Sequence, residues 1–322
     1  MSSLKPVALT AEPEVRDRRK TMAPRRSLLR EMARMRQAYF LLAPILLIII
    51  VFDYYPPLSG LYHAFFTWSP GNPSSFVGLD NFKAVVSSAD FGQQCANMVK
   101  LVGFGTAIAI VAPLGVALLL FHLRNAVAKE IYRLLIIVPT VVPGIVGLLV
   151  WKYLYDPNLG LINALLDGLG LHSLAHDWLA DPNVALYSVL FVGFPWLNGT
   201  SVLIFLAGLS TIPGEILEAA ELDGCTGWRR VWSIELPLIG GQVRLLTTLA
   251  VIGGLQAYEN LLVLTNGNAE TNTPALNMYK TAFSDGYFGE AAAIGCLLFV
   301  VCFALTLLIN RGFARQAART GA

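Results

Sequence analysis

Charged residues are scarce in this sequence: Asp, Glu, Lys and Arg make up 14% of its 322 residues, whereas 55% are hydrophobic. Soluble domains carry roughly 25% charged residues, so this composition indicates a membrane protein. The four cysteines have no metal-binding or redox spacing, and we expect them to be small apolar side chains without a disulfide. The sequence also lacks the phosphate-binding motif G-x-x-x-x-G-K-[ST], which excludes ATP hydrolysis by this chain.

Long apolar runs predict an all-α integral membrane protein with six transmembrane helices, because a bilayer core about 30 Å thick needs roughly 20 apolar residues per helix. The first run begins only near Ala38 and ends in a poor cleavage site. We therefore expect an uncleaved helix that continues through a kink at Pro56 and Pro57. Pro139 and Pro143 predict a second kink, in the third helix. The predicted spans are 38–62, 98–122, 132–154, 184–209, 244–265 and 290–310.

Positive charge is distributed unevenly among the connections. The two ends of the chain and the second and fourth connections hold 19 of the 23 Lys and Arg residues. Such segments stay in the cytoplasm, so we expect both termini and the fourth connection (210–240) there. The chain then divides into a basic N-terminal tail (1–37), a six-helix domain (38–310) and a C-terminal tail (311–322). We expect the N-terminal tail to fix the topology and to meet anionic lipid.

The outward connections carry signals for interfacial structure. Phe76–Phe82 is apolar and aromatic around a turn, and we expect it to lie against the membrane interface. Asp156 opens an Asp-Pro-Asn turn, after which residues 161–169 place five apolar side chains on one helical face. This pattern predicts a short amphipathic helix in the interface. Two histidines and an aspartate follow within 172–177, and with so few donors we expect no metal site.

The fourth connection contains a short helix rich in carboxylates. Ser210 or Thr211 can cap it, Pro213 suits its first turn, and Gly224 is placed to end it. One face carries mainly small side chains, with carboxylates beside it: Ile216, Ala219, Ala220 and Asp223 share that face. A helix this short is unstable alone in water. It packs either on the chain's own cytoplasmic ends or on a partner whose Arg or Lys side chains pair with the carboxylates.

The same stretch resembles the EAA loop of binding-protein-dependent ABC importer permeases. The matching residues are Glu218-Ala219-Ala220, Asp223-Gly224 and Ile234-Glu235-Leu236-Pro237, preceded by Ile212-Pro213 and Glu215. The likeness extends from about Ala38 to Asn310 and is closest to the permeases of the maltose and glycerol-3-phosphate type. One departure is Asn266-Gly267-Asn268, where family members usually have Gly-Gly-Pro in a loop that faces the binding protein.

The resemblance implies the type I importer permease fold, with the short helix docked in a cleft of a cytoplasmic ATPase. The implied coupling residues are Glu215, Glu218, Ala219, Ala220, Asp223, Gly224, Leu236 and Pro237. It also implies a second permease subunit, two ATPase subunits and an extracytoplasmic solute-binding protein as partners, in a bacterial or archaeal cell membrane. ATP and Mg would be bound by the ATPase, and we expect no cofactor or metal on this chain. Nothing in the sequence indicates a nucleic-acid partner.

Polar residues within two predicted spans are candidates for the substrate path, because such residues are costly in a membrane. They could equally hold helices together. The candidates are Gly193, Trp196, Asn198 and Thr200 in the fourth helix and Gln256, Tyr258, Glu259 and Asn260 in the fifth. Aromatic rings beside amides and hydroxyls suit a sugar, and the spans hold no clear Lys or Arg for an anion. This favours a neutral sugar or oligosaccharide over glycerol 3-phosphate or a related polyol phosphate.

Two other classes of membrane protein fit less well. An ion-coupled secondary transporter commonly has inverted repeats, of which the sequence shows none, and it would leave the carboxylate-rich helix unexplained. An intramembrane enzyme needs a catalytic cluster, and the spans contain no Ser/His, metal-ligand or paired-carboxylate arrangement. We therefore expect a transport subunit without enzymatic activity.

Overall fold

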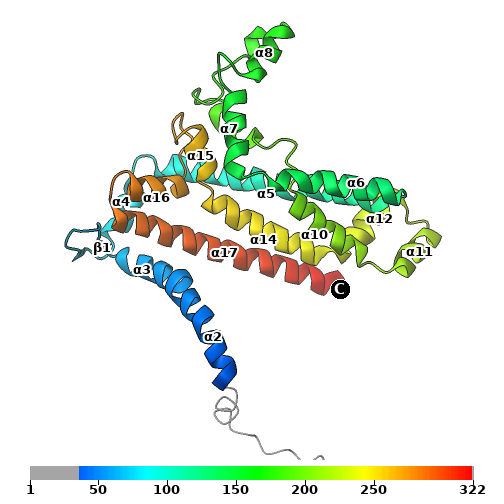
Figure 1. The fold of residues 1–322 in the computed structure, drawn as a ribbon, viewed down its shortest axis with the longest axis horizontal. Coiled ribbons are helices and arrows are strands. Elements are labelled where there is room, and N and C mark those ends of the chain that lie inside the picture. Colours follow the sequence, from blue (N-terminus) through cyan, green and yellow to red (C-terminus); the bar gives the residue numbers. More distant parts are fainter. Residues whose placement is uncertain (1–35, 321–322) are drawn as a thin grey trace, which may run out of the picture. The chain divides into compact units, whose positions relative to one another are not determined.

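The computed structural model describes residues 36–320, which are almost entirely helical (Figure 1). Two compact units meet at Pro56/Pro57 and are described separately. The first contains α2 (Arg36–Ile49) and a π-helical turn, η1 (Ile50–Tyr54). The predicted first span is confirmed as continuous helix over Tyr39–His63. The predictions for residues 1–35 of the N-terminal tail lie outside the described residues.

The π-helical turn η1 has a local cause. Pro56 and Pro57 follow it at the start of α3 (Tyr55–His63). A proline has no N–H to donate, and its ring clashes with the carbonyl four residues earlier. A turn wider than the α-helix accommodates this clash, so the predicted irregularity takes the form of a π-turn rather than a break.

The second unit is organised around long helices packed side by side. α5 (Phe91–His122) and α17 (Phe288–Thr320) are single helices long and apolar enough to cross a membrane. α14 (Gly240–Gln256) packs against both, and α10 (Gly199–Ser210) packs against α5 (Figure 1). α17 continues into the segment predicted as a C-terminal tail. An apolar cluster joins α5, α10 and α14: Ala117, Leu120, Val202, Phe205, Leu206, Leu209, Ile239 and Leu246.

The third predicted span bends where its prolines predict. α6 (Ala126–Ile137) passes through a 3₁₀ turn, η2 (Val138–Val141), and α7 (Gly144–Leu154) then leaves at 86°. Pro139 lies in the 3₁₀ turn and Pro143 precedes α7. The proline rings stop the helical hydrogen-bond ladder, which explains the confirmed kink.

The fourth and fifth predicted spans are not continuous helices, which corrects the sequence-based boundaries. Residues 184–209 form α9 (Ala185–Phe191) and α10, separated by a non-helical segment. Residues 244–265 form α14 and α15 (Glu259–Leu264), with a break after Gln256. Three described helices are long enough to span a membrane, and six spans result only if each of three bent helix pairs counts as one.

The connections predicted to face outward form short elements, of which α4 (Asp80–Ser87) and α16 (Pro274–Phe283) pack on α5 and α17. Asn81 holds the first of these connections in place: its Nδ2 donates to the carbonyls of Ala64 and Phe66, at 2.8 and 2.9 Å. The strands β1 (Phe66–Thr67) and β2 (Ser75–Phe76) pair antiparallel. The other elements on these connections are α8 (Leu161–Gly168) and η3 (His172–Leu174).

α8 is the amphipathic helix predicted after the Asp156 turn. The carboxylate of Asp156 accepts from the backbone N–H groups of Leu159 and Asn158, which together hold the pKa of this group below its usual range. Leu161 and Leu165 are exposed on α8, whereas Asn163 is buried. The exposed apolar face suits the membrane interface.

A strained loop between α15 and α16 is bonded to α5 by a buried amide. Asn266, Ala269 and Glu270 adopt left-handed φ values of 51°, 51° and 58°, which non-glycine residues rarely do. Asn97 of α5 is 1% exposed, and its Nδ2 donates to the carbonyls of Glu270 at 2.6 Å and Asn272 at 2.9 Å. The conformation of this loop therefore depends on α5.

Replacing Asn97 by Ala leaves both loop carbonyls without this donor. We expect Asn97→Ala to lower the free energy of unfolding by about 1–3 kcal/mol, measured by thermal unfolding of the purified protein. Gln93→Ala is the matched control, because Gln93 is exposed and its side chain forms one hydrogen bond within the described residues, to Asn97 Oδ1 at 3.2 Å. Equal unfolding midpoints for the two variants would contradict the assigned role of Asn97.

Candidate functional site

The carboxylate-rich helix predicted in the fourth connection is α11 (Gly214–Leu222). Pro213 precedes it with φ −59° and ψ 135°. At the other end Gly224 adopts the left-handed φ of 70°. The N–H of Gly224 bonds the Glu221 carbonyl at 3.1 Å and that of Cys225 bonds the Ala220 carbonyl at 2.8 Å. This pair of bonds is a Schellman motif, which ends the helix sharply and fixes its length.

The predicted N-terminal cap of α11 is wrong. The Ser210 hydroxyl donates to the Leu206 carbonyl at 2.7 Å, and the Thr211 hydroxyl donates to the Gly208 carbonyl at 2.7 Å. Both hydroxyls therefore satisfy the end of α10, the preceding helix, and α11 has no side-chain cap. Sequence alone could not decide between the two helix ends, because both residues lie between them.

α11 exposes most of its surface. Glu215, Glu218 and Ala219 are exposed, and Leu222 is 90% exposed. Ala220 is buried, so the two alanines do not present one common outer face as the helical spacing suggested. Sequence reasoning missed Leu222, whose apolar character beside the carboxylates was the available signal.

The segment after α11 returns to the interior. It consists of α12 (Gly227–Arg230), a π-turn η4 (Val231–Glu235) and α13 (Leu236–Leu238). Leu236 and Pro237 are half-buried, and Leu236 packs on the apolar cluster of α5, α10 and α14. These two residues therefore connect the loop to the helices, while Asp223 forms the exposed C-cap of α11.

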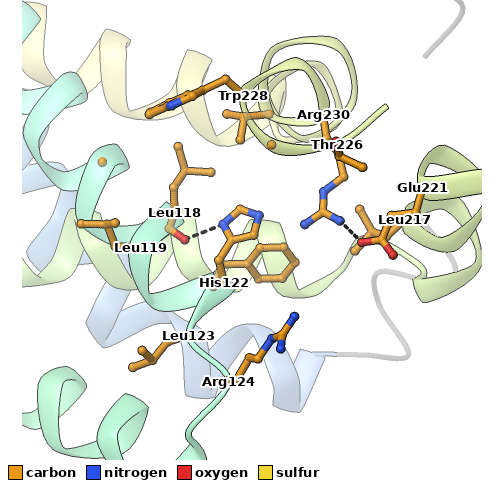
Figure 2. Close-up of a pocket in the computed structure, with 14 residues that line it drawn as sticks. Leu118, Leu119, His122, Leu123, Arg124, Leu217, Glu221, Thr226, Trp228 and Arg230 are labelled. Atoms are coloured by element: carbon orange, nitrogen blue, oxygen red, sulfur yellow. Dashed lines mark hydrogen bonds and ion pairs between the residues drawn. The ribbon is translucent and has the colours of Figure 1, made fainter. Parts of the chain in front are cut away.

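An ionic cluster lies between α11 and the end of α5, and sequence reasoning missed it. Glu235 is fully buried, and its Oε1 lies 3.0 Å from both Arg230 Nε and His122 Nε2. Arg230 Nη1 lies 2.6 Å from Glu221 Oε1. Figure 2 shows Arg230 directed at Glu221, beside a cavity of about 1010 Å³. A carboxylate within an otherwise apolar segment, and a histidine at the end of a predicted span, were the available signals.

A second cavity, of about 480 Å³, lies where the fourth and fifth predicted spans are broken. Gly193, Trp196 and Asn198 line it from the segment between α9 and α10. Gly253 and Asn260 line it from the two sides of the break between α14 and α15. Non-helical backbone is tolerated at membrane depth only where it is buried in protein or lines a water-filled cavity, so the breaks and the cavity belong together.

Two hydrogen-bonding groups at this cavity have no partner. Trp196 Nε1 and Thr106 Oγ1 are buried and form no hydrogen bond within the described chain. Trp196 also adopts a left-handed φ of 58°, an unfavourable conformation for a tryptophan, and its ring meets Phe104 edge-on at 6.0 Å. Unpaired buried donors and backbone strain both mark functional positions. Thr106 and Phe104 lie on α5 and escaped the sequence analysis, because nothing in the sequence links α5 to the breaks.

Four predicted path residues lie outside this cavity. The break after Gln256 removes the continuous polar face that their spacing predicts. Tyr258 faces a different cavity and stacks on Tyr279 at 4.9 Å. The other three are exposed on the surface and do not line the cavity: Gln256, Glu259 and Thr200.

Similarity to known proteins agrees with this arrangement. Residues 109–318 match the family described as binding-protein-dependent transport system inner membrane component. The diacetylchitobiose uptake system permease protein NgcF of Streptomyces coelicolor is 31% identical over 281 residues, covering 83% of this chain and 80% of that protein. The sn-glycerol-3-phosphate transport system permease protein UgpA of Agrobacterium fabrum is 30% identical over 275 residues, covering 83% of this chain and 91% of that protein.

The fold is also that of a solved transporter. The crystal structure of a bacterial ABC transporter involved in the import of the acidic polysaccharide alginate contains a chain that aligns with a TM-score of 0.79 at 21% identity. The alignment covers 90% of this chain and 99% of that chain. A second structure of a bacterial alginate ABC transporter, in complex with a pentasaccharide-bound periplasmic protein, aligns with a TM-score of 0.78.

The family match covers well over half of the chain. The two permease relatives agree with it, since each aligns with this chain over most of its own length. The chain therefore belongs to the binding-protein-dependent ABC transporter permeases, multi-pass inner-membrane subunits of importers that are not themselves catalytic.

Proposed function

We propose that this chain forms half of the translocation path for a neutral saccharide. The observation that carries this proposal is the cavity at the two helix breaks. Its aromatic rings, amides and unpaired donors match a sugar, which has apolar ring faces and hydroxyl edges. None of the described residues that line the cavity is charged, so it offers an anion no cationic partner.

The names of the relatives support a carbohydrate but also include an anion. One relative takes up diacetylchitobiose, and another is a multiple sugar-binding transport system permease. A third transports sn-glycerol 3-phosphate. Because a buried phosphate is usually held by Lys or Arg side chains, the uncharged cavity favours the saccharide.

The coupling part of the proposal assigns α11 to an ATPase. The exposed Glu215, Glu218 and Leu222 form a surface with charge and an apolar anchor, on a helix that is fixed at its C-terminal end. ATP and Mg bind to that ATPase, whose closure pushes α11. The assembly comprises this chain, a second permease, two ATPase subunits and an extracytoplasmic binding protein. Lys and Arg are concentrated on the side of α11, which supports a cytoplasmic location for it and for both termini.

The substrate class is tested with the intact transporter, purified from its native membrane and reconstituted with its binding protein. We expect neutral oligosaccharides such as diacetylchitobiose or maltose to stimulate ATP hydrolysis and sn-glycerol 3-phosphate to leave it unstimulated. Stimulation by sn-glycerol 3-phosphate alone would overturn the saccharide assignment.

The cavity is tested by removing its aromatic ring. We expect Trp196→Ala to reduce saccharide transport by about tenfold or more, because loss of a stacking platform and a donor costs about 1.4 kcal/mol or more. Tyr187→Ala is the control, since Tyr187 is 61% exposed on α9 and does not line the cavity. Equal transport rates for the two variants would exclude the cavity as the path.

The docking surface is tested by reversing one charge. We expect Glu218→Lys to abolish co-purification of the ATPase with tagged chain. Glu130→Lys is the matched control, with the same charge change on α6 outside the loop, where Glu130 pairs with Arg133 at 3.1 Å and with no other described residue. If the ATPase is retained by Glu218→Lys, or if none co-purifies with the wild-type chain, the coupling proposal fails.

A further inference from the structure

We infer that four side chains form an ionic strut that makes α11 and the end of α5 move as one body. The ionic strut consists of His122, Glu235, Arg230 and Glu221. The inference rests on the proposed function, in which an ATPase displaces α11. It assigns Arg230 and Glu235 as positioning residues, which act on transport by passing this displacement to α5.

The ionic strut ties α11 to the rest of the chain. The two ends of α11 are turns at Pro213 and Gly224, and Ala220 is the one buried residue of α11. Within the described part of the chain, the bond from Arg230 to Glu221 is the only side-chain hydrogen bond between α11 and another element. Without this bond, a push on α11 would reach the membrane helices through its two flanking turns and the packing of Ala220.

The ionic strut is a continuous chain of polar contacts. His122 Nδ1 lies 2.8 Å from the Leu118 carbonyl, and its Nε2 lies 3.0 Å from Glu235 Oε1. Arg230 Nε donates to the same Glu235 oxygen at 3.0 Å, and Arg230 Nη1 donates to Glu221 Oε1 at 2.6 Å. Hydrogen bonds between a guanidinium and carboxylates are shorter and stronger than hydrogen bonds between neutral groups.

Burial makes the inner part of the ionic strut hard to deform. The Glu235 side chain is 0% exposed and that of Arg230 is 14% exposed. Glu235 Oε2 has no partner in the described residues, so the carboxylate depends on its two bonds at Oε1. Removal of the Arg230 guanidinium would leave the buried Glu235 carboxylate without its cationic partner, which is strongly unfavourable.

The inner end of the ionic strut lies on the apolar cluster that joins three membrane helices. The Ile239 N–H donates to the Glu235 carbonyl at 3.2 Å, and Ile239 is 1% exposed within that cluster. The cluster contains Leu120 of α5, two residues before His122, and Leu209 of α10. Coupling between distant sites travels through such chains of hydrogen bonds and packed side chains. A displacement of α11 therefore reaches α5, α10 and α14 together.

The test measures one distance in the intact complex, without transported substrate. Spin labels are placed at Gly214→Cys on α11, where a side chain meets open space, and at Leu119→Cys on α5, where Leu119 is 74% exposed. The four native cysteines are replaced by alanine. We expect double electron–electron resonance to give one narrow distance distribution between the two labels. This distribution should not change when ATP and Mg are added.

In Arg230→Gln we expect the distance distribution to be broader without nucleotide and to shift when ATP and Mg are added. In a separate assay, ATP hydrolysis stimulated by substrate and its binding protein should fall at least tenfold. Arg229→Gln removes the same charge one residue earlier, where Arg229 is exposed and has no ion pair within the described chain, and it should keep wild-type values. If Arg230→Gln does not fold, Glu221→Gln takes its place, because the Glu221 side chain is 58% exposed.

Two outcomes would overturn the ionic strut: a wild-type distance that changes with ATP and Mg, or identical distributions in Arg230→Gln (or Glu221→Gln) and Arg229→Gln. Failure of the proposed function looks different, because no ATPase would then co-purify with the wild-type chain. The distances measured without nucleotide would still distinguish the variants in that case.

Discussion

Hydrocarbon offers a peptide group no hydrogen-bond partner, and this requirement governs where the chain can leave the helix. The proline bend in the third predicted span keeps its backbone paired through a 3₁₀ turn, whose last bond is the Val142 N–H to the Pro139 carbonyl. The breaks in the fourth and fifth predicted spans instead coincide with a cavity. Helix ends, rather than charged side chains, therefore provide polarity inside the apolar part of the protein, and the substrate path we propose is located where the helical ladder stops.

The end of the molecule that carries α11 follows a different rule, because we propose that it lies in water, where charges can be used. The buried Glu235 carboxylate at this end is compensated by Arg230 and also contacts His122, directly beside the apolar cluster of Ile239 and Leu120. Apolar packing holds the helices together but is non-directional. The charged hydrogen bonds, in contrast, require a defined distance and angle between the groups that they join. The combination gives the loop after α10 a defined position, although α11 itself is mostly exposed.

Sequence reasoning predicted features that depend on local chemistry. The length of the apolar run predicted the first span, and the prolines predicted the bend near Pro143. Gly224 predicted the end of α11. Each of these features depends on residues close in sequence. The misses required tertiary information. The spacing of Gln256 and Asn260 assumed a continuous helix, Thr106 reaches the cavity from a distant segment, and Glu235 meets His122 across 113 residues. The cap at Ser210 failed because two helix ends compete for the same hydroxyls.

The exposed Leu222 has a consequence for the life of the protein in the cell. Together with Trp228 and Trp232, which are 75% and 68% exposed, it places apolar surface on the α11 end of the molecule as long as the chain is alone. A copy synthesised in excess of its partners would present this surface to chaperones and proteases, whereas an assembled copy would hide it. The amount of this permease would then follow the supply of its partners, so that the subunit ratio is set by degradation of orphan copies as well as by synthesis.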